Sequence, residues 1–341
     1  MIVVLTRTSS DVRYLTDDAA NEIDGLRDGG PEWWVRSVDE TTRTAADVLR
    51  GSSRSRVVGY DLVMSAPRAV SALMALDEVS GSAIVAAHRA AVAEAVDYLA
   101  RRATVHCSTR RGEENATRAL LGPVVSFTHG INRAGEPHLH DHVLVGSGLE
   151  DRDGVVSARH LRYHVRAADA LYRSRLRHSV NGATPWTVRR PFAGSEVVEG
   201  LDAGAFVCWS GERARGGSKL AWTRDGATSR WRRDLAEAEP IGVDVPRRSA
   251  RLDHHVVERG VIATGRLFRR DIVGAVADAW SHGARSSEVE ALVDAALAGR
   301  LRGSLAEEAA VSGGERVILA SRLIDGARAG RHRTVALERE P

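Results

Sequence analysis

The sequence feature that most constrains the fold is FTHGINRAGEPHLHDHVLV at residues 127–145, which holds four of the chain's 13 histidines. Apolar residues in and around this segment predict one strand at 124–131 and another at 139–145. If Ala134-Gly135 lies at the centre of the turn between them, the two strands form an antiparallel hairpin.

The register of this hairpin follows from its turn, because the numbers of facing residues add up to a constant. Arg133 then faces Glu136, and His129 faces His140 with His142 on the diagonal. Facing Cβ atoms lie about 5 Å apart and diagonal neighbours about 7–8 Å apart, distances that imidazoles can span. Three imidazole nitrogens can thus converge on one ion and leave coordination positions open, as in a catalytic metal site.

A hairpin with solvent-facing histidines is the simpler alternative. Two histidines at positions i and i+2 alone, as at His140 and His142, would favour it, whereas a third in register across the hairpin favours a metal site. His138 shares the face of this pair by the two-residue period of a strand and is a competing ligand. Because it follows Pro137 at the start of the strand, we assign it to the rim.

The remaining segments predict a mixture of strands and helices. Ser82 is expected to cap a long helix, and His88 to be a packing residue on it. We expect one compact unit at residues 1–245 and a helical C-terminal region at 246–341. The individual elements are further strands at 2–6, 57–65 and 104–108, and helices at 15–30, from about Arg68, at 83–103, at 158–180 and, with breaks, at 266–297.

The amino-acid composition indicates which kind of partner and which cell compartment suit the protein. The 48 basic side chains are arginines apart from Lys219, and arginine binds phosphate through a two-point fork. Nucleic acid is therefore a compatible partner, although a GC-rich genome would give the same bias. The two cysteines lack a metal-binding spacing, and the start of the chain lacks the pattern of a signal peptide. With no apolar run near the roughly 20 residues of a membrane span, we expect a cytoplasmic protein without a membrane partner.

The histidine segment also resembles the three-histidine motif of the MobF relaxases, the TrwC/TraI-like branch of the HUH endonucleases. That motif is a histidine followed by Arg, Pro and L-H-x-H at fixed spacing. Three further stretches, at 59–76, 88–103 and 161–180, resemble other segments of the family, and the similarity fades towards residue 245. The matching motif residues here are His129, Arg133, Pro137, Leu139, His140 and His142.

The resemblance implies an α+β, HUH-type relaxase fold in residues 1–245, with a central antiparallel β-sheet flanked by helices and a helical C-terminal region. It implies single-strand DNA cleavage in conjugative transfer or mobilisation, in which a tyrosine oxygen attacks the scissile phosphorus and becomes a 5′-phosphotyrosine. The implied cofactor is a divalent metal ion, Mg²⁺ or Mn²⁺ first and Zn²⁺ as an alternative. The implied partners are single-stranded DNA at a transfer origin and accessory transfer or coupling proteins.

The resemblance also assigns residues to this chemistry. Tyr14 follows the first expected strand, as the family's first catalytic tyrosine does. Asp61 matches the acidic residue beside the histidines; it could orient a histidine or accept the tyrosine proton, and otherwise it is a structural carboxylate. The sequence departs from many relatives because Leu15 follows Tyr14 and no tyrosine occurs in residues 15–59, which puts a two-tyrosine mechanism in doubt.

Four arginines are candidates for binding DNA, with solvated surface as the alternative for each: Arg68, Arg133, Arg189 and Arg190. The chain contains no GxxxxGK[ST] motif, so we expect no ATP-driven helicase activity. A rolling-circle replication initiator with the same chemistry, a catalytically impaired DNA-binding derivative and a hydrolase of small substrates remain as alternatives.

Overall fold

The computed structural model describes residues 2–8, 32–33, 57–102, 104–107, 117–119, 124–132, 136–146, 148–149, 152–156, 158–191, 196–201, 229–233, 256–257 and 268–297. The strands are β1 (Ile2–Thr8), β2 (Glu32–Trp33), β3 (Val57–Ser65), β4 (Thr104–Cys107), β5 (Thr117–Ala119), β6 (Val124–Ile131), β7 (Pro137–Gly146), β8 (Gly148–Leu149), β9 (Arg152–Val156), β10 (Val188–Arg189) and β11 (Val197–Val198). The main helices are α4 (Arg68–Leu76), α5 (Glu78–Arg102), α6 (Ala158–Ala183), α9 (Arg269–Ala279) and α10 (Ser286–Leu297).

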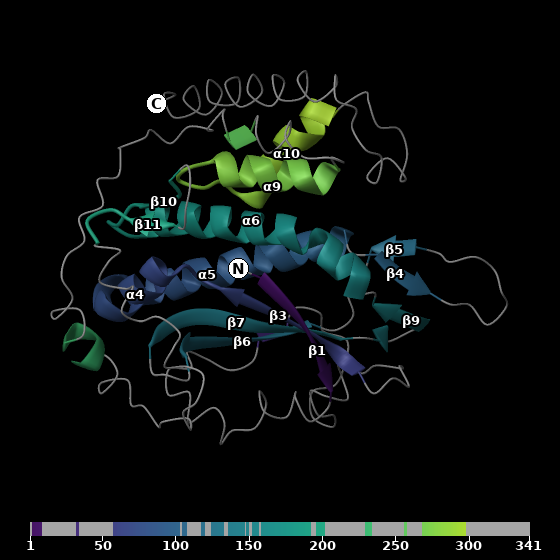
Figure 1. Ribbon diagram of the computed structural model, residues 1–341, viewed down its shortest axis with the longest axis horizontal. Coiled ribbons are helices and arrows are strands. Elements are labelled where there is room, and N and C mark those ends of the chain that lie inside the picture. Colours follow the sequence, from purple (N-terminus) through teal and green to yellow (C-terminus); the bar gives the residue numbers. More distant parts are fainter. Residues whose placement is uncertain are drawn as a thin grey trace, which may run out of the picture.

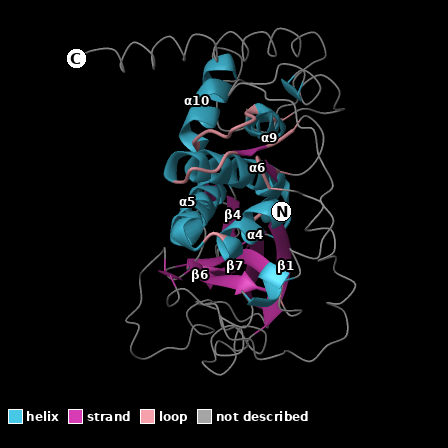
Figure 2. Cartoon of the chain, turned by 90° about the vertical axis from the view of Figure 1, so that its left-hand side faces the viewer, coloured by secondary structure: helices cyan, strands magenta, loops and turns pink. Residues whose placement is uncertain are grey.

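The central sheet has the strand order β1-β3-β7-β6-β2, and each neighbouring pair is antiparallel. Strands β3, β7 and β6 lie inside the sheet, with β1 and β2 at its edges. Helices α4, α5 and α6 cover one face, and α9 and α10 lie beyond α6, farther from the sheet (Figure 1, Figure 2). The predicted α+β class, an antiparallel sheet with helices and a helical C-terminal part, is confirmed.

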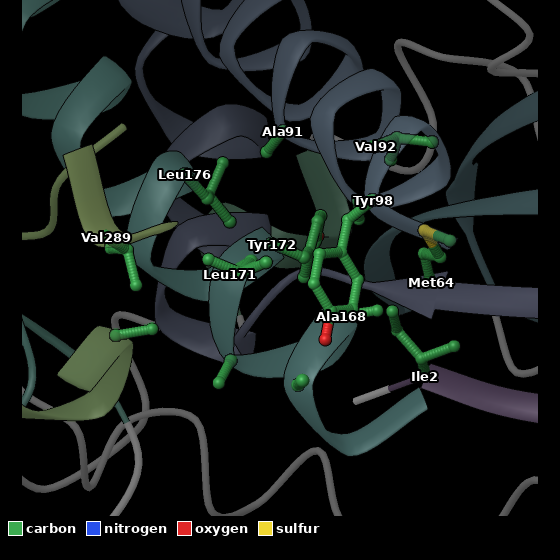
Figure 3. Packing of buried hydrophobic residues seen from close by; sticks show 14 of the residues in the cluster. Ile2, Met64, Ala91, Val92, Tyr98, Ala168, Leu171, Tyr172, Leu176 and Val289 are labelled. Carbon is green, nitrogen blue, oxygen red and sulfur yellow. The ribbon is translucent and has the colours of Figure 1, made fainter. Parts of the chain in front are cut away.

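The two-residue period of the strands separates an apolar face from a polar one. On β3, Tyr60, Leu62 and Met64 belong to the hydrophobic core under the helices, whereas Asp61 lies on the opposite face. The core runs from the sheet through α5 and α6 to α10; in Figure 3, Ile2 and Met64 of the sheet lie on the right, Val289 of α10 lies on the left, and Tyr98 lies between them. The sheet is thus anchored from one side by apolar packing, which leaves the other face for polar chemistry.

Most strands and helices begin where they were predicted, including the helices at Arg68 and Ala158, but one helix begins earlier. The strands expected at 57–65 and 124–131 have those bounds in the structure. The helix expected at 83–103 begins at Glu78 instead, so the expectation that Ser82 caps it was wrong. The Asp77 carboxylate accepts the backbone N–H groups of Val79 (3.1 Å) and Ser80 (3.2 Å), which satisfies free donors of the first turn one turn earlier than predicted.

Helices α9 and α10 account for the helical stretch predicted, with breaks, at 266–297. The turn between them contains Gly283 at a φ of +84°, and a Cβ atom there would lie 2.0 Å from the backbone oxygen of Ser174 on α6. Buried Arg177 on α6 binds the backbone oxygens of Ala277 (3.2 Å) and Trp280 (3.1 Å). The division at residues 245 and 246 stays a prediction, but the described helices beyond it share one core with the sheet.

The helix that the sequence predicts at 15–30 lies outside the described residues. Within the part of the chain that the structure describes, no helix is long and apolar enough to cross a membrane.

Replacement of Gly283 by alanine should destabilise the protein by about 2–4 kcal/mol, because the residue needs a positive φ and the new methyl group would meet the α6 backbone. Gly182→Ala is the matched control, since a Cβ atom there meets nothing within 4 Å; its stability should stay the same or rise by up to about 1 kcal/mol. Urea titration of both variants measures the difference. Equal losses in the two variants would contradict the close docking of the α9–α10 turn on α6.

Candidate metal centre

Three histidines gather on the polar face of the sheet, at the hairpin of β6 and β7. His129 pairs directly with His140 across the two strands, which is the register predicted from the turn. The ring centroids of His129 and His140 lie 5.2 Å apart, and the ring of His142 lies 5.3 Å from each of them. One nitrogen from each ring lies within 4.8 Å of the others. This trio can hold a metal ion.

The hydrogen bonds of two of these rings determine which nitrogen of each ring could bind an ion. His140 Nδ1 lies 2.7 Å from the backbone oxygen of His138, and His142 Nδ1 lies 2.9 Å from Asp61 Oδ2. Because these oxygens can only accept a hydrogen bond, each Nδ1 is the donor and each Nε2 keeps its lone pair for a ligand. Burial and the neighbouring histidines also hold the pKa of His140 well below 6.5, so its ring stays neutral. The donor set therefore fits a divalent metal.

Asp61 has no exposed surface and is held from two sides. Its Oδ2 accepts hydrogen bonds from His142 and from Arg7 on β1, whose Nη2 lies 2.5 Å and whose Nε lies 3.0 Å away. The guanidinium offsets the electrostatic cost of burying the carboxylate. The other oxygen, Oδ1, has no hydrogen-bond partner among the described residues. Asp61 thus orients a ring of the trio, which is one of the two roles that were considered for it.

Arg7 was missed by the sequence reasoning, although a signal was present. Leu5 pairs with Asp61 across β1 and β3, so Arg7 lies two residues further along β1 on the same face of the sheet. A basic residue at an alternate position of the first strand, beside a strand with a buried carboxylate, is the pattern that would have identified it.

His138 lies beside the trio without belonging to it. Its Nε2 is 3.3 Å from Ser65 Oγ at the end of β3. Burial, followed by the positive charge of Arg68, lowers the pKa of His138 to about 4. The pairing of β6 and β7 becomes irregular between His129 and Ile131, which breaks the simple alternation near the turn. His138 is absent from the converging group of the described residues, in agreement with its assignment to the rim.

The opposite face of β7 carries a second buried polar cluster. Asp141, between the two ligand positions of β7, lies 2.9 Å from His88 Nε2 on α5 and accepts a hydrogen bond from Ser126 Oγ at 2.5 Å. His88 Nδ1 lies 2.8 Å from the hydroxyl oxygen of Tyr172 on α6. Burial raises the pKa of Asp141, but His88 and then Ser126 outweigh it and lower this pKa to about 2.

This cluster ties β7, the strand that bears two histidines of the trio, to α5 and α6. His88 is buried, as the prediction of a packing residue implies, but its specific partner was not foreseen. Asp141 and His88 are separated by 53 residues in sequence, so only the tertiary structure reveals their contact. The sequence signal was a charged residue at the middle of an otherwise apolar strand face.

The remaining predicted site residues have different surroundings. Tyr14 and Arg133 lie outside the described residues, and Arg68 is exposed at the start of α4. Arg189 is buried and lies 2.9 Å from Glu199, and Arg190 forms an ion pair with Asp278. DNA binding by Arg189 and Arg190 stays a prediction, and both guanidinium groups already have carboxylate partners within the protein.

Replacement of His142 by alanine should abolish measurable Mn²⁺ binding, because it removes one of three converging nitrogens. His138→Ala is the control from the same strand and should change the dissociation constant by only a few fold. Isothermal titration calorimetry with Mn²⁺ compares the two variants. Loss of binding in His138→Ala with retention in His142→Ala would show that the trio is assigned wrongly.

The buried cluster behind β7 gives a separate prediction about stability. Asp141→Asn should lower the free energy of unfolding by about 1–3 kcal/mol, because it leaves buried hydrogen-bonding groups poorly matched. Asp97→Asn makes the same chemical change in an exposed ion pair with Arg101 and should cost no more than about 0.5 kcal/mol. Chemical denaturation measures both values, and a similar small loss in the two variants would contradict the structural role of Asp141.

The family model described as TrwC relaxase matches residues 13–215. The chain is 35% identical over 120 residues to the multifunctional conjugation protein TraI of Escherichia coli (strain K12), a match that covers 33% of this chain and 6% of that protein. This chain therefore corresponds to a small part of that relative.

The fold is similar to that of solved TrwC structures. The metal-bound structure of conjugative relaxase TrwC in complex with OriT DNA has a TM-score of 0.53 and 19% identity, and the match covers 71% of this chain and 100% of that chain. TrwC complexed with a 27-mer DNA comprising the recognition hairpin and the cleavage site has a TM-score of 0.51, with the same identity and coverage. The relaxase-type fold expected from the histidine motif is confirmed by these likenesses.

Proposed function

The chain belongs to the TrwC relaxase family, and from this premise we propose that it nicks and rejoins one strand of DNA during conjugative transfer or mobilisation. The observation that carries the proposal is the trio of His129, His140 and His142, in which the Nδ1 atoms of His140 and His142 are hydrogen-bonded and leave Nε2 for a ligand. The family and its relatives favour this function over a replication initiator or a non-catalytic DNA-binding protein.

The trio and Asp61 are the residues that would hold a divalent metal and keep it in place. When bound, the ion would supply positive charge next to the non-bridging oxygens of the scissile phosphate, where negative charge develops. Asp61 keeps His142 oriented, and Arg7 holds Asp61. Mg²⁺ and Mn²⁺ are the ions proposed first and Zn²⁺ second; the metal-bound structure of TrwC supports a metal cofactor.

Tyr14 is the proposed nucleophile. Its phenol oxygen would attack the scissile phosphorus while the bond between phosphorus and the 3′ oxygen breaks, which gives a 5′-phosphotyrosine and a 3′ oxygen that takes a proton from water to become a free 3′-OH. The phenol proton needs an acceptor, since a free phenol has a pKa of about 10. Asp61 Oδ1, a buried atom without a partner among the described residues, supports Asp61 as that acceptor. Attack by the 3′-OH on the phosphotyrosine reverses the step and rejoins the strand.

The proposed substrate is single-stranded DNA at the transfer origin of the element that encodes the protein. One solved TrwC structure contains OriT DNA and another contains a 27-mer DNA with the recognition hairpin and the cleavage site, which supports this class of ligand. Accessory transfer or coupling proteins are proposed as further partners, and the nicking step requires no ATP because the transesterification conserves the energy of the phosphodiester bond.

The proposal is tested by incubating the protein with single-stranded oligonucleotides from candidate transfer origins and Mn²⁺ or Mg²⁺. A covalent adduct that survives denaturation is expected on one strand, with release of the 3′-OH fragment. Tyr14→Phe should abolish it, whereas Tyr98→Phe, a tyrosine in the core of α5, should keep it. Absence of an adduct on every candidate strand would sink the relaxase function, and an adduct formed by Tyr14→Phe would overturn the nucleophile alone.

A further inference from the structure

The start of α6 presents a line of cationic side chains to solvent. Arg159, Arg162, Tyr163 and Arg166 follow the spacing i, i+3, i+4 and i+7, so they share one face of the helix. All four are exposed, with 44% of the Tyr163 surface accessible. We call these residues, together with Arg270 of α9, the α6 arginine stripe.

Aromatic rings hold part of this stripe in place. The guanidinium carbon of Arg270 lies 4.3 Å from the ring centroid of Tyr163 and 4.2 Å from that of Phe268, while Arg159 lies 5.9 Å from the Tyr163 ring. Such cation–π contacts are worth about 0.5–1 kcal/mol at exposed sites. They order guanidinium groups from two helices on one surface.

The position of the stripe works against the stability of α6. The amino end of a helix carries partial positive charge, so Arg159 in the first turn costs about 0.3–1 kcal/mol, and the like charges of Arg162 at i+3 from Arg159 and of Arg166 at i+4 from Arg162 add about 0.2–0.5 kcal/mol per pair. The first turn of α6 contains no acidic residue that would compensate. Among the described residues, no carboxylate forms an ion pair with any arginine of the stripe.

The neighbouring arginines of α5 show the contrast. Arg101 and Arg102 lie in the last turn of that helix, where cations are favourable, and both bind Glu290 of α10, at 2.7 Å and 3.3 Å. These two side chains therefore have a structural explanation. The α6 arginine stripe has no structural counterpart of this kind, and a polyanion would relieve its repulsion.

We propose that the α6 arginine stripe binds the phosphate backbone of the DNA that the protein nicks, at a place separate from the cleavage site. From Arg159 to Arg166 the helix rises about 10 Å, close to the length of three base-pair steps along the axis of a DNA duplex at about 3.4 Å each. The stripe lies on the helical side of the sheet, whereas the trio lies on the other face, so it contributes affinity and not chemistry. This inference rests on the proposed function.

The test compares Arg159→Gln/Arg162→Gln with the charge-matched control Arg232→Gln/Arg285→Gln, whose arginines are exposed elsewhere. Fluorescence anisotropy measures binding to transfer-origin DNA of increasing length between low and high salt. The stripe variant should bind long DNA at least tenfold more weakly at low salt. Its slope of log K against log salt should be smaller by about 1.4–1.8, because two phosphate contacts are lost. The control should bind like the wild type.

Two further readouts keep the outcomes apart. The stripe variant should still form the covalent adduct on a short oligonucleotide at saturating concentration, and its melting temperature should be unchanged or higher because repulsion is relieved. An unchanged salt slope with normal adduct formation would contradict DNA binding by the α6 arginine stripe and leave the relaxase function intact. The alternative partner of the stripe would then be an acidic protein. Absence of any adduct from the wild type would contradict the proposed function whatever the slope shows.

Discussion

The structure depends on strand β7 carrying polar side chains on both of its faces in the middle of a sheet. His140 and His142 point to one face, and Asp141 between them points to the other, as the two-residue period of a strand requires. Asp141 is fully buried under the helices, where an unpaired carboxylate would be very unfavourable. Its contacts with His88 and Ser126 satisfy it and at the same time fix the backbone that presents the two histidines.

The same principle operates on the polar face. Asp61 is buried, and its charge is matched by Arg7 and by the N–H of His142. Each of these two carboxylates therefore has a histidine partner. Asp61 binds His142 at the metal centre, and Asp141 binds His88 in the helical core. The helical layers hold this arrangement, since α5 and α6 contribute His88 and Tyr172, and α9 and α10 brace α6 from outside. Fold and candidate site are thus stabilised by the same contacts.

The hairpin of β6 and β7 and its register could be predicted from the local sequence. The turn position was sufficient to pair His129 with His140, because antiparallel register is arithmetic once the turn is known. Asp61 came only from resemblance to a family, since a carboxylate on a strand has no local signature of function. The contact of His88 with Asp141 could not be predicted, because it joins segments far apart in sequence. The cap at Asp77 was missed because Ser82 also fits the local preference.

The central claim is that three histidines of the hairpin hold one divalent metal ion. Crystals of the protein grown with Mn²⁺ and measured near the manganese absorption edge test it most directly. The account predicts a single anomalous peak within bonding distance of the Nε2 atoms of His140 and His142 and of a nitrogen of His129, with the Asp61 carboxylate hydrogen-bonded to His142 and not to the ion. A peak bound by His138, or none in crystals soaked in excess Mn²⁺, would contradict it.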